Sequence, residues 1–403
     1  MWLANLKIVL PDEVIAQGAI CIEEGMIQAV RADAAPEPAF DCSGLTAIPG
    51  LIDLHGDMLE REISPRPQSE FPIDLALAEV DKRLAGSGVT TAFAAVSFHW
   101  HNNKPLRSEE WARKIIQIVN DMRPVLLTDH YVHARFEITN PEGGEVLKEL
   151  LEKDQVRLVS IMDHTPGQGQ YRDIEHYVQF AIEWAKQQDG HDISEEEMRR
   201  RIAEAQKRPK AWKAVNDLTA IAREHGITLA SHDDDTLEKV ELMASLGVNI
   251  SEFPVTYQAG QKAKEKGIHV LMGAPNAYRG VSTTTGNLSA QEAIQEGFVD
   301  TLASDYYPAA MIQAPFRLAQ KQVLSLPEAI KLVSLNAAEA LNMNDRGAIE
   351  AGRRADIALV EEAAHVRVHA VLREGLPIYW DRTMAQRRHP IDTSNLMSTT
   401  TPR

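Results

Sequence analysis

The sequence predicts an α/β protein in which a distorted (β/α)₈ TIM barrel is joined to a small β-sandwich domain built from both ends of the chain. The 403 residues exceed the usual size of one compact domain and suit a large domain with a smaller companion. In the middle of the chain, short apolar runs alternate with longer helical patterns, as repeated βα units around a parallel sheet do. Short segments typical of antiparallel strands occupy both ends.

The two ends of the chain have the same pattern of short, strand-like segments. Residues 1–48 contain LKIVL, GAICIEE and MIQAV, interrupted by Pro11, Gly18 and Gly25. Residues 345–403 contain GAIEAG, ADIALVE, VRVHAVLREG and LPIYW, which we also interpret as strands. We therefore expect 1–48 and 345–403 to meet in one small β domain, with the barrel spanning 49–344.

Eight apolar runs between these ends predict the strands of the barrel. They span 50–55, 89–96, 130–137, 156–164, 227–232, 248–253, 268–273 and 299–305. Eight strands favour a closed barrel over an open, doubly wound sheet.

One connection, between His164 and Ile227, is much longer than the others. Ser194 with Glu197 predicts a helix start, and Met198, Ile202 and Ala205 then share one face of the helix. Arg199 to Arg201 are tempting as a phosphate site, but beside three glutamates they indicate a solvated helix face.

Charge and composition exclude several function classes. A formal net charge of −16 argues against nucleic-acid or anionic-membrane partners, while a small anionic substrate can still enter a local cationic pocket. Cys21 and Cys42 lack any metal-binding spacing, so we expect free thiols in a reducing compartment. The first residues lack the apolar core of a secretory signal, and we expect a cytoplasmic protein. The sequence leaves open whether the protein forms a homo-oligomer.

Potential metal ligands follow the predicted strands, where a (β/α)₈ barrel carries its chemistry. They are His55, Asp57, Glu137, His164, His232 and Asp305. The His-x-Asp spacing at 55–57 places both side chains on one strand face, where one ion can accept a nitrogen and an oxygen. Either histidine at 164 or 232 could instead be a hydrogen-bonded core residue.

Glu137 follows His133 and Arg135 at period two, so the three side chains should face the same way. No lysine that could form a carbamate bridge occurs in the third or fourth run, which makes Glu137 the predicted bridging carboxylate. The alternative is a salt bridge between Glu137 and Arg135.

Asp305 is the predicted catalytic base as well as a ligand, because a carboxylate there could accept a proton from water. A helix cap is the alternative role. Six nitrogen and oxygen ligands suit one or two divalent ions, with zinc first and manganese or another divalent ion as alternatives. His99 and His101 form an H-x-H in a polar loop, which we interpret as a loop or substrate contact.

Several motifs resemble a known family. Residues 49–55 (PGLIDLH) and 354–357 (RADI) resemble the first-strand and closing segments of the amidohydrolase superfamily. The segments MDHTPGQGQY, SHDDDT, SEFPVT, MGAPNAYRG and SDYYP resemble the phosphonate-metabolism family PhnM, as do HGDMLERE and PRP near 55–67. The resemblance implies an amidohydrolase-type barrel and a phosphoanhydride hydrolase, which converts α-D-ribose 1-methylphosphonate 5-triphosphate to the 5-phosphate and diphosphate. The family's segment Ser-His-Ser-Gly-Asn is replaced here by residues 283–287 (TTTGN).

A triphosphate substrate requires cationic and hydroxyl donors. Guanidinium groups bind phosphate oxygens in a fork, which makes Arg279, Arg66 and Arg172 the predicted clamps. Further predicted donors are Thr283, Thr284 and Asn287. Two alternatives are a deacylase or cyclic-amide hydrolase that uses the same metals, and a non-catalytic binding subunit.

Overall fold

The computed structural model describes residues 1–403 except 37, 67–68, 100–104, 190–191, 284–285 and 388–403. Eight parallel strands form the barrel in the order β13-β12-β11-β10-β9-β8-β7-β6. They are β6 (Leu51–Gly56), β7 (Val89–Phe98), β8 (Asp129–Glu137), β9 (Leu158–Met162), β10 (Thr228–His232), β11 (Ile250–Glu252), β12 (His269–Gly273) and β13 (Thr301–Ala303). A parallel bridge between Gly56 and Asp305 brings the first and last strands together. Each predicted barrel strand is confirmed.

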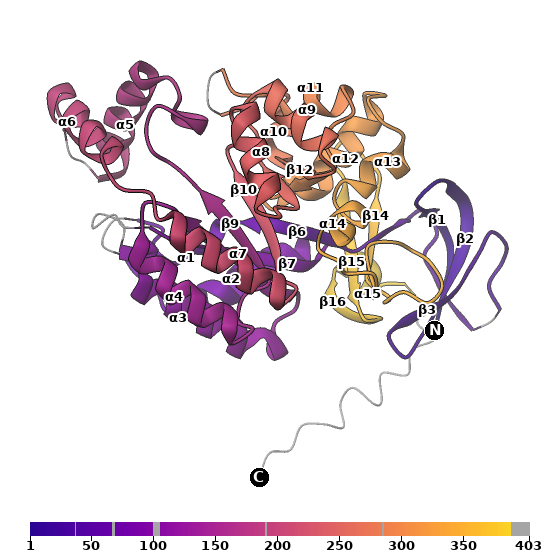
Figure 1. Cartoon of the computed structure of the whole chain (residues 1–403). Helices are drawn as coiled ribbons and strands as arrows, with labels where there is room; N and C mark the ends of the chain where they lie inside the picture. Colours follow the sequence, from indigo (N-terminus) through magenta and orange to yellow (C-terminus); the bar gives the residue numbers. More distant parts are fainter. Residues whose placement is uncertain (37, 67–68, 100–104, 190–191, 284–285, 388–403) are drawn as a thin grey trace, which may run out of the picture.

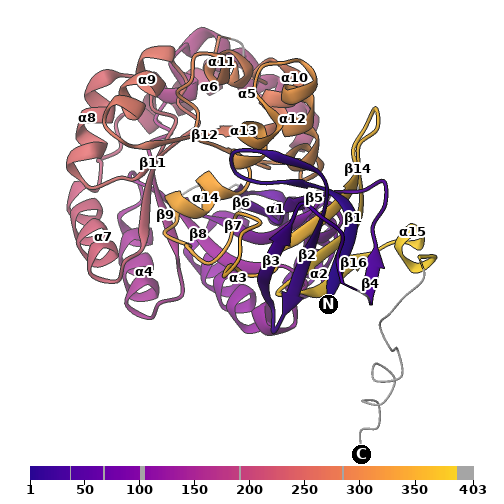
Figure 2. The ribbon, with the colours of Figure 1, turned by 90° about the vertical axis from the view of Figure 1, so that its right-hand side faces the viewer.

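Helices surround the barrel, as the view in Figure 2 shows. They are α1 (Met58–Ile63), α2 (Ile73–Gly86), α3 (Glu109–Met122), α4 (Pro141–Glu152), α7 (Trp212–Glu224), α8 (Leu237–Ser245), α9 (Tyr257–Glu265), α10 (Ala274–Arg279), α11 (Ala290–Gln295), α12 (Ala309–Gln320), α13 (Leu326–Lys331) and α14 (Leu335–Ala340). Short 3₁₀ turns lie at Pro105–Arg107, Arg123–Val125 and Gly169–Tyr171. All ten residues of β7 are buried, because a strand in such a barrel is covered on both faces.

The strands from the two ends of the chain form a second, mixed sheet. Its order is β16-β15-β14-β5-β1-β2-β3, with β4 paired to β1. The strands are β1 (Trp2–Val9), β2 (Val14–Glu23), β3 (Met26–Arg31), β4 (Ala39–Asp41), β5 (Thr46–Pro49), β14 (Ile357–Glu361), β15 (Arg367–Arg373) and β16 (Leu376–Trp380), followed by the short helix α15 (Arg382–Ala385). The antiparallel pairing of β5 with β14 confirms that the two ends meet.

One predicted strand, GAIEAG at 347–352, is wrong, because no strand forms there. Gly347 and Gly352 both adopt positive φ angles, near 88° and 87°, which make the backbone turn rather than extend. Ala348 and Ile349 in this turn are nevertheless buried.

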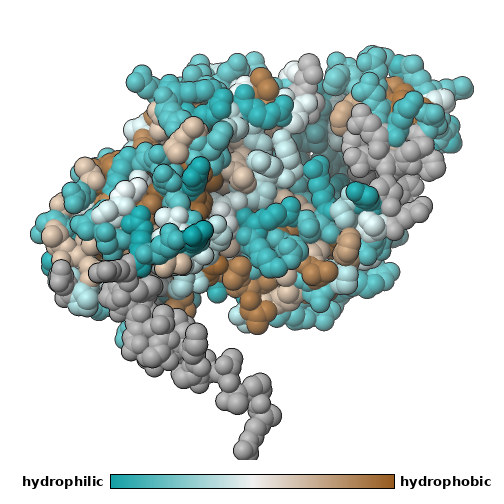
Figure 3. Space-filling view, turned by 180° about the vertical axis from the view of Figure 1, so that it is seen from behind, coloured by the Kyte–Doolittle hydropathy of each residue, from teal (hydrophilic) through white to brown (hydrophobic). Residues whose placement is uncertain are grey.

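The long connection after β9 forms a helical hairpin of α5 (Ile174–Asp189) and α6 (Glu195–Gln206), which projects from the body at the upper left of Figure 1. Val178, Met198 and Ile202 give the hairpin a small core of its own. The Ser194 side chain accepts a hydrogen bond from the Glu197 N–H, so the predicted helix start is confirmed. Arg199 and Arg200 form ion pairs with glutamates on the exposed face, as expected for a solvated surface. The face of the molecule drawn in Figure 3 is mostly hydrophilic, with several apolar patches.

At the amino end of the barrel strands, buried charges are held by opposite charges or hydrogen-bond donors. Asp129 is the first residue of β8. Arg346 Nη1 lies 2.9 Å from its Oδ2, and Arg123 Nη2 lies 2.9 Å from its Oδ1. Burial raises the pKa of Asp129, but Arg346 and Arg123 outweigh this effect and lower it to about 2. Asp81 of α2 accepts from the Leu127 and Thr128 N–H groups. At this end of the barrel, the carboxylates of Asp129 and Asp81 therefore each have a cation or a hydrogen-bond donor as a partner.

Two smaller expectations concern thiols and membranes. Cys21 and Cys42 are buried and free, as predicted. Among the described residues, no helix is long and apolar enough to cross a membrane.

Candidate functional site

The carboxyl ends of the barrel strands open into a cavity of about 620 Å³. All six predicted ligands line it: His55, Asp57, Glu137, His164, His232 and Asp305. His164 lies two residues beyond the end of β9 rather than on the strand, because the chain turns there and the His164 N–H donates to the Glu137 carboxylate at 3.2 Å. The structure thus brings the predicted ligands to one mouth.

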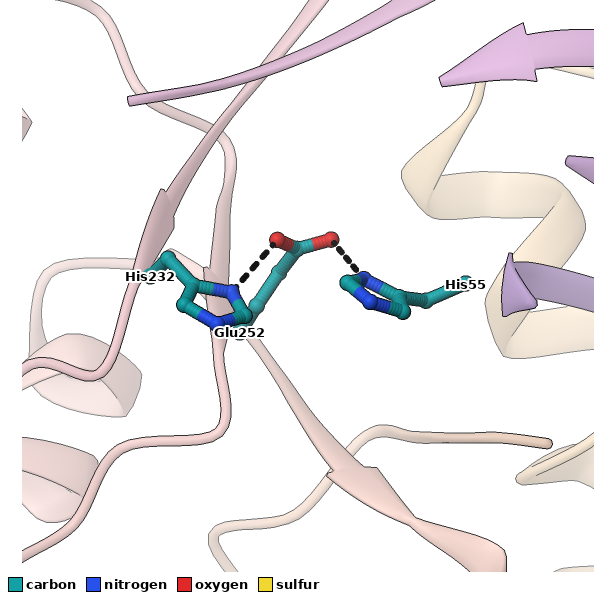
Figure 4. Close-up of side chains that lie close together, drawn as sticks. All are labelled: His55, His232 and Glu252. Atoms are coloured by element: carbon teal, nitrogen blue, oxygen red, sulfur yellow. Dashed lines mark hydrogen bonds and ion pairs between the residues drawn. The ribbon is translucent and has the colours of Figure 1, made fainter. Parts of the chain in front are cut away.

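A deep cluster lies around Glu252, the last residue of β11. His55 Nδ1 lies 3.3 Å from Glu252 Oε1, and His232 Nδ1 lies 3.2 Å from Glu252 Oε2 (Figure 4). His133 Nε2 is 3.4 Å from Glu252 Oε1. Ser160 also donates its hydroxyl to this carboxylate. Because Glu252 contacts the Nδ1 atoms of His55 and His232, the Nε2 atoms of both rings are the candidate ligand atoms, and Arg135 Nη2 lies 3.3 Å from that of His232.

Burial and the neighbouring histidines shift the pKa values of this cluster. Burial raises the pKa of Glu252, but His133 and His55 outweigh burial and hold the pKa well below its usual value. Burial also lowers the pKa of His133 to about 3, against the opposing charge of Glu252. Glu252 is therefore an anion, and His133 is neutral at physiological pH.

An outer cluster forms around Glu137 and His164. His164 Nδ1 lies 2.8 Å from Glu137 Oε2, and His164 Nε2 lies 3.7 Å from Asp233 Oδ2. His232 Nε2 is 3.8 Å from Asp233 Oδ1, which links the outer cluster to the deep one. His99 Nε2 approaches Glu137 Oε2 to 4.0 Å. His101, its predicted companion, lies outside the described residues.

Asp57 and Asp305 form the third part of the site, where the barrel closes. The Asp57 N–H donates to the Asp305 carbonyl at 3.0 Å, and the Asp305 N–H donates to the His55 carbonyl at 2.9 Å. Burial and the neighbouring Asp57 raise the pKa of Asp305 to about 6, while His55 and Arg135 oppose the rise. Asp57 Oδ1 is buried and has no hydrogen-bond partner among the described residues.

Donor groups of these clusters can hold a metal ion. Three sets offer one ligand atom per residue within 4.8 Å of one another: His55, His232 and Glu252; His99, Glu137 and His164; and His164, His232 and Asp233. The like charges of Asp57 and Asp305, together with the orphaned Asp57 Oδ1, call for a cation between them. The donor set of imidazole nitrogens and carboxylate oxygens fits a divalent ion.

The predicted substrate-binding residues divide into two groups. Thr283 and Asn287 line the cavity, and Arg172 Nη1 donates to Asn287 Oδ1 at 2.7 Å. Arg66 and Arg279 are exposed and are not part of the described cavity wall. Thr284 lies outside the described residues.

Sequence reasoning did not single out Glu252, and it named Asp233 only as an alternative proton acceptor to Asp305. Glu252 lies in the sixth predicted run, next to its final residue Phe253, where the search for polar strand ends could have found it. Asp233 directly follows His232, so it also lies at a strand end. Glu137 contacts His164 rather than forming the alternative pair with Arg135, whose Nη2 lies 3.3 Å from His232 Nε2.

Comparison with known proteins agrees with this geometry. The pattern of the amidohydrolase family matches residues 46–378, and the chain belongs to this family. Its buried histidine and glutamate cluster is typical of an amidohydrolase metal site.

At the level of single proteins, the chain is 36% identical over 386 residues to the alpha-D-ribose 1-methylphosphonate 5-triphosphate diphosphatase of Escherichia coli (strain K12), with 94% of this chain and 100% of the relative covered. It is thus an amidohydrolase-superfamily hydrolase homologous to that diphosphatase, which confirms the resemblance seen in the sequence.

Solved structures show the same fold. Dihydropyrimidinase from Brevibacillus agri superposes with a TM-score of 0.62 at 14% identity, over 94% of this chain and 95% of that chain. N-acetyl-D-glucosamine-6-phosphate deacetylase from Mycobacterium smegmatis gives 0.62 at 16% identity, over 94% and 100%.

Proposed function

We propose that this hydrolase cleaves α-D-ribose 1-methylphosphonate 5-triphosphate to the 5-phosphate and diphosphate, acting in the cytoplasm. The observation that carries the proposal is the match to a diphosphatase of this activity along that relative's whole length. The cavity of about 620 Å³ suits a substrate of this size, since small-molecule sites usually measure about 300–1,000 Å³.

We assign His55, Asp57, Glu137, His164, His232 and Asp305 to one or two divalent ions, with zinc as the first choice. Their nitrogen and oxygen donors without sulfur support this assignment. When bound, such ions lower the pKa of a water molecule toward about 7 and neutralise charge on phosphoryl oxygens.

In the proposed reaction, the oxygen of water forms a bond to phosphorus while the anhydride P–O bond breaks. The electron pair of that bond leaves with diphosphate. Asp305 accepts a proton from the attacking water, because its raised pKa of about 6 makes it a better base than an ordinary aspartate near neutral pH. Glu252 positions His55 and His232 through their Nδ1 atoms.

The deciding experiment is a steady-state assay of the purified protein on ribosyl and nucleoside triphosphates, with Zn²⁺ or Mn²⁺ added or removed. We expect diphosphate release that depends on the metal and is greatest with the ribosyl methylphosphonate substrate. A panel of acylated amines and cyclic amides serves as the comparison. Amine release or ring opening without diphosphate release would contradict the proposal, and a protein without bound metal and without turnover would indicate a binding subunit.

A further inference from the structure

The described part of the cavity wall carries three cationic side chains, Arg107, Arg135 and Arg201. Two of them already have an acidic partner. Arg107 Nη2 lies 2.8 Å from Glu60 Oε2, and Arg201 Nε lies 2.8 Å from Glu197 Oε1. Among the residues that the structure describes, Arg135 forms no ion pair with a carboxylate, and its Nη2 lies 3.3 Å from the ring nitrogen Nε2 of His232.

Arg135 is also buried, with 8% of its surface exposed. Its Nε has no hydrogen-bond partner among the described residues. Burying a charge without a counter-charge costs several kcal/mol, so folded proteins pair or coordinate buried charges. The missing counter-charge of Arg135 is therefore expected to arrive with a ligand.

The strand places this guanidinium at the centre of the site. His133, Arg135 and Glu137 alternate along β8 and contact Glu252, His232 and His164 in turn. The charge of Arg135 also acts on the Asp305 carboxyl. The guanidinium thus lies between the deep cluster and the outer cluster.

Resting on the proposed diphosphatase function, we propose that Arg135 binds the phosphoryl group attacked by water and donates N–H groups to its non-bridging oxygens. A guanidinium presents several donors in a planar fork and keeps its charge at any working pH. Negative charge on those oxygens must be stabilised as the anhydride bond breaks, and a fixed cation in a site shielded from water does so without reorganising. Arg66 and Arg279, which we predicted for phosphate binding, are exposed and not on the described cavity wall.

The test compares Arg135→Ala and Arg135→Lys with Arg200→Gln, a control on the exposed face of α6. The probe is inorganic triphosphate, titrated calorimetrically into metal-loaded protein whose metal content is measured in parallel. Loss of charge-assisted hydrogen bonds should weaken triphosphate binding about 10- to 100-fold in Arg135→Ala. Arg135→Lys should recover part of the affinity, added guanidinium ion should restore binding to Arg135→Ala, and the control should bind as the parent does.

Unchanged triphosphate affinity in Arg135→Ala with its metal retained would overturn the inference. If Arg135→Ala loses its metal, the test rests on Arg135→Lys. A triphosphate affinity of Arg135→Lys equal to that of the parent would then count against the inference. A parent protein that binds triphosphate through Arg135 but hydrolyses no ribosyl triphosphate would refute the proposed function alone. A parent that hydrolyses it while Arg135→Ala keeps both KM and kcat would refute the inference alone.

Discussion

The two ends of strand β8 treat charge in opposite ways. At its first residue, Asp129 lies between Arg346 and Arg123, each within 2.9 Å. Roughly 26 Å further along the strand, at the rate of about 3.3 Å per residue, Glu137 faces the cavity. Around that end, Arg135 has no acidic partner among the described residues, and Asp57 repels Asp305.

This difference separates stability from function within one barrel. Opposite charges at the amino end stabilise the folded chain, because each depressed carboxyl pKa is a contribution to folding. Like charges and unpaired groups at the carboxyl end destabilise the protein until a ligand or metal compensates them. Variants at the two ends should therefore change different measurements.

The largest effect is expected for Asp305→Asn at the cavity. The amide keeps an oxygen but loses the basicity, so kcat should fall on the order of 10²- to 10⁴-fold with a smaller change in KM. The metal-free variant should also be more stable than the parent, by on the order of 1 kcal/mol, since a carboxyl with a raised pKa opposes folding at neutral pH. Kinetics and urea unfolding of the same preparation check both results. Near-full activity across pH would show that Asp305 is a spectator and would direct attention to Asp233.

Arg346→Met, at the opposite end of the barrel, should lower stability and leave the activity unchanged. Removing this guanidinium leaves Asp129 buried with fewer cations, which should lower the free energy of unfolding by about 3 kcal/mol. Below the unfolding transition, kcat and KM should match those of the parent, because Arg346 is not among the described residues that line the cavity. A kinetic defect at full folding would break the proposed separation of the two ends.

Glu252→Gln sharpens the comparison within the site. Gln presents an N–H₂ group where two histidine Nδ1 atoms now face oxygens, so the rings should lose their fixed orientation. Metal affinity, measured by competition with a chelator, should fall about 10- to 100-fold. Asp81→Asn, which also changes a buried carboxylate next to a histidine, is the matched control and should lower stability without altering metal affinity.

The smallest expected effect is a loss of folding stability at low pH. The folded-state pKa of Asp129 is lowered from 3.8 to about 2, so its contribution is complete above the unfolded pKa and is lost as the pH falls from about 4 to about 2. The contribution amounts to roughly 2 kcal/mol. Unfolding free energies of the parent and of Asp129→Asn, measured at pH 6 and pH 3, should converge on acidification. A constant gap between them would contradict the prediction.

The barrel could be predicted from the sequence because buried parallel strands are continuous apolar runs with polar residues at their ends. The same pattern led to His55 and His232. Contacts made across the closed barrel could not be predicted, since Glu252 reaches His55 only when strands distant in the sequence come together. Residue type within a motif predicts Arg66 and Arg279 as phosphate clamps but does not show whether a side chain lies on the cavity wall. The sequence pattern pairs Arg135 with Glu137, whereas the turn after β9 gives Glu137 a different partner, His164.

The pairing of β5 with β14 has a consequence for synthesis on the ribosome. β5 leads directly into β6 and His55, yet one of its edges is covered only by a strand made after the entire barrel. Until β14 emerges, that edge presents unpaired backbone groups that another nascent chain could bind. Chains interrupted before residue 357 should therefore aggregate more readily than complete ones, although every described residue of the cavity wall has been made by Tyr306.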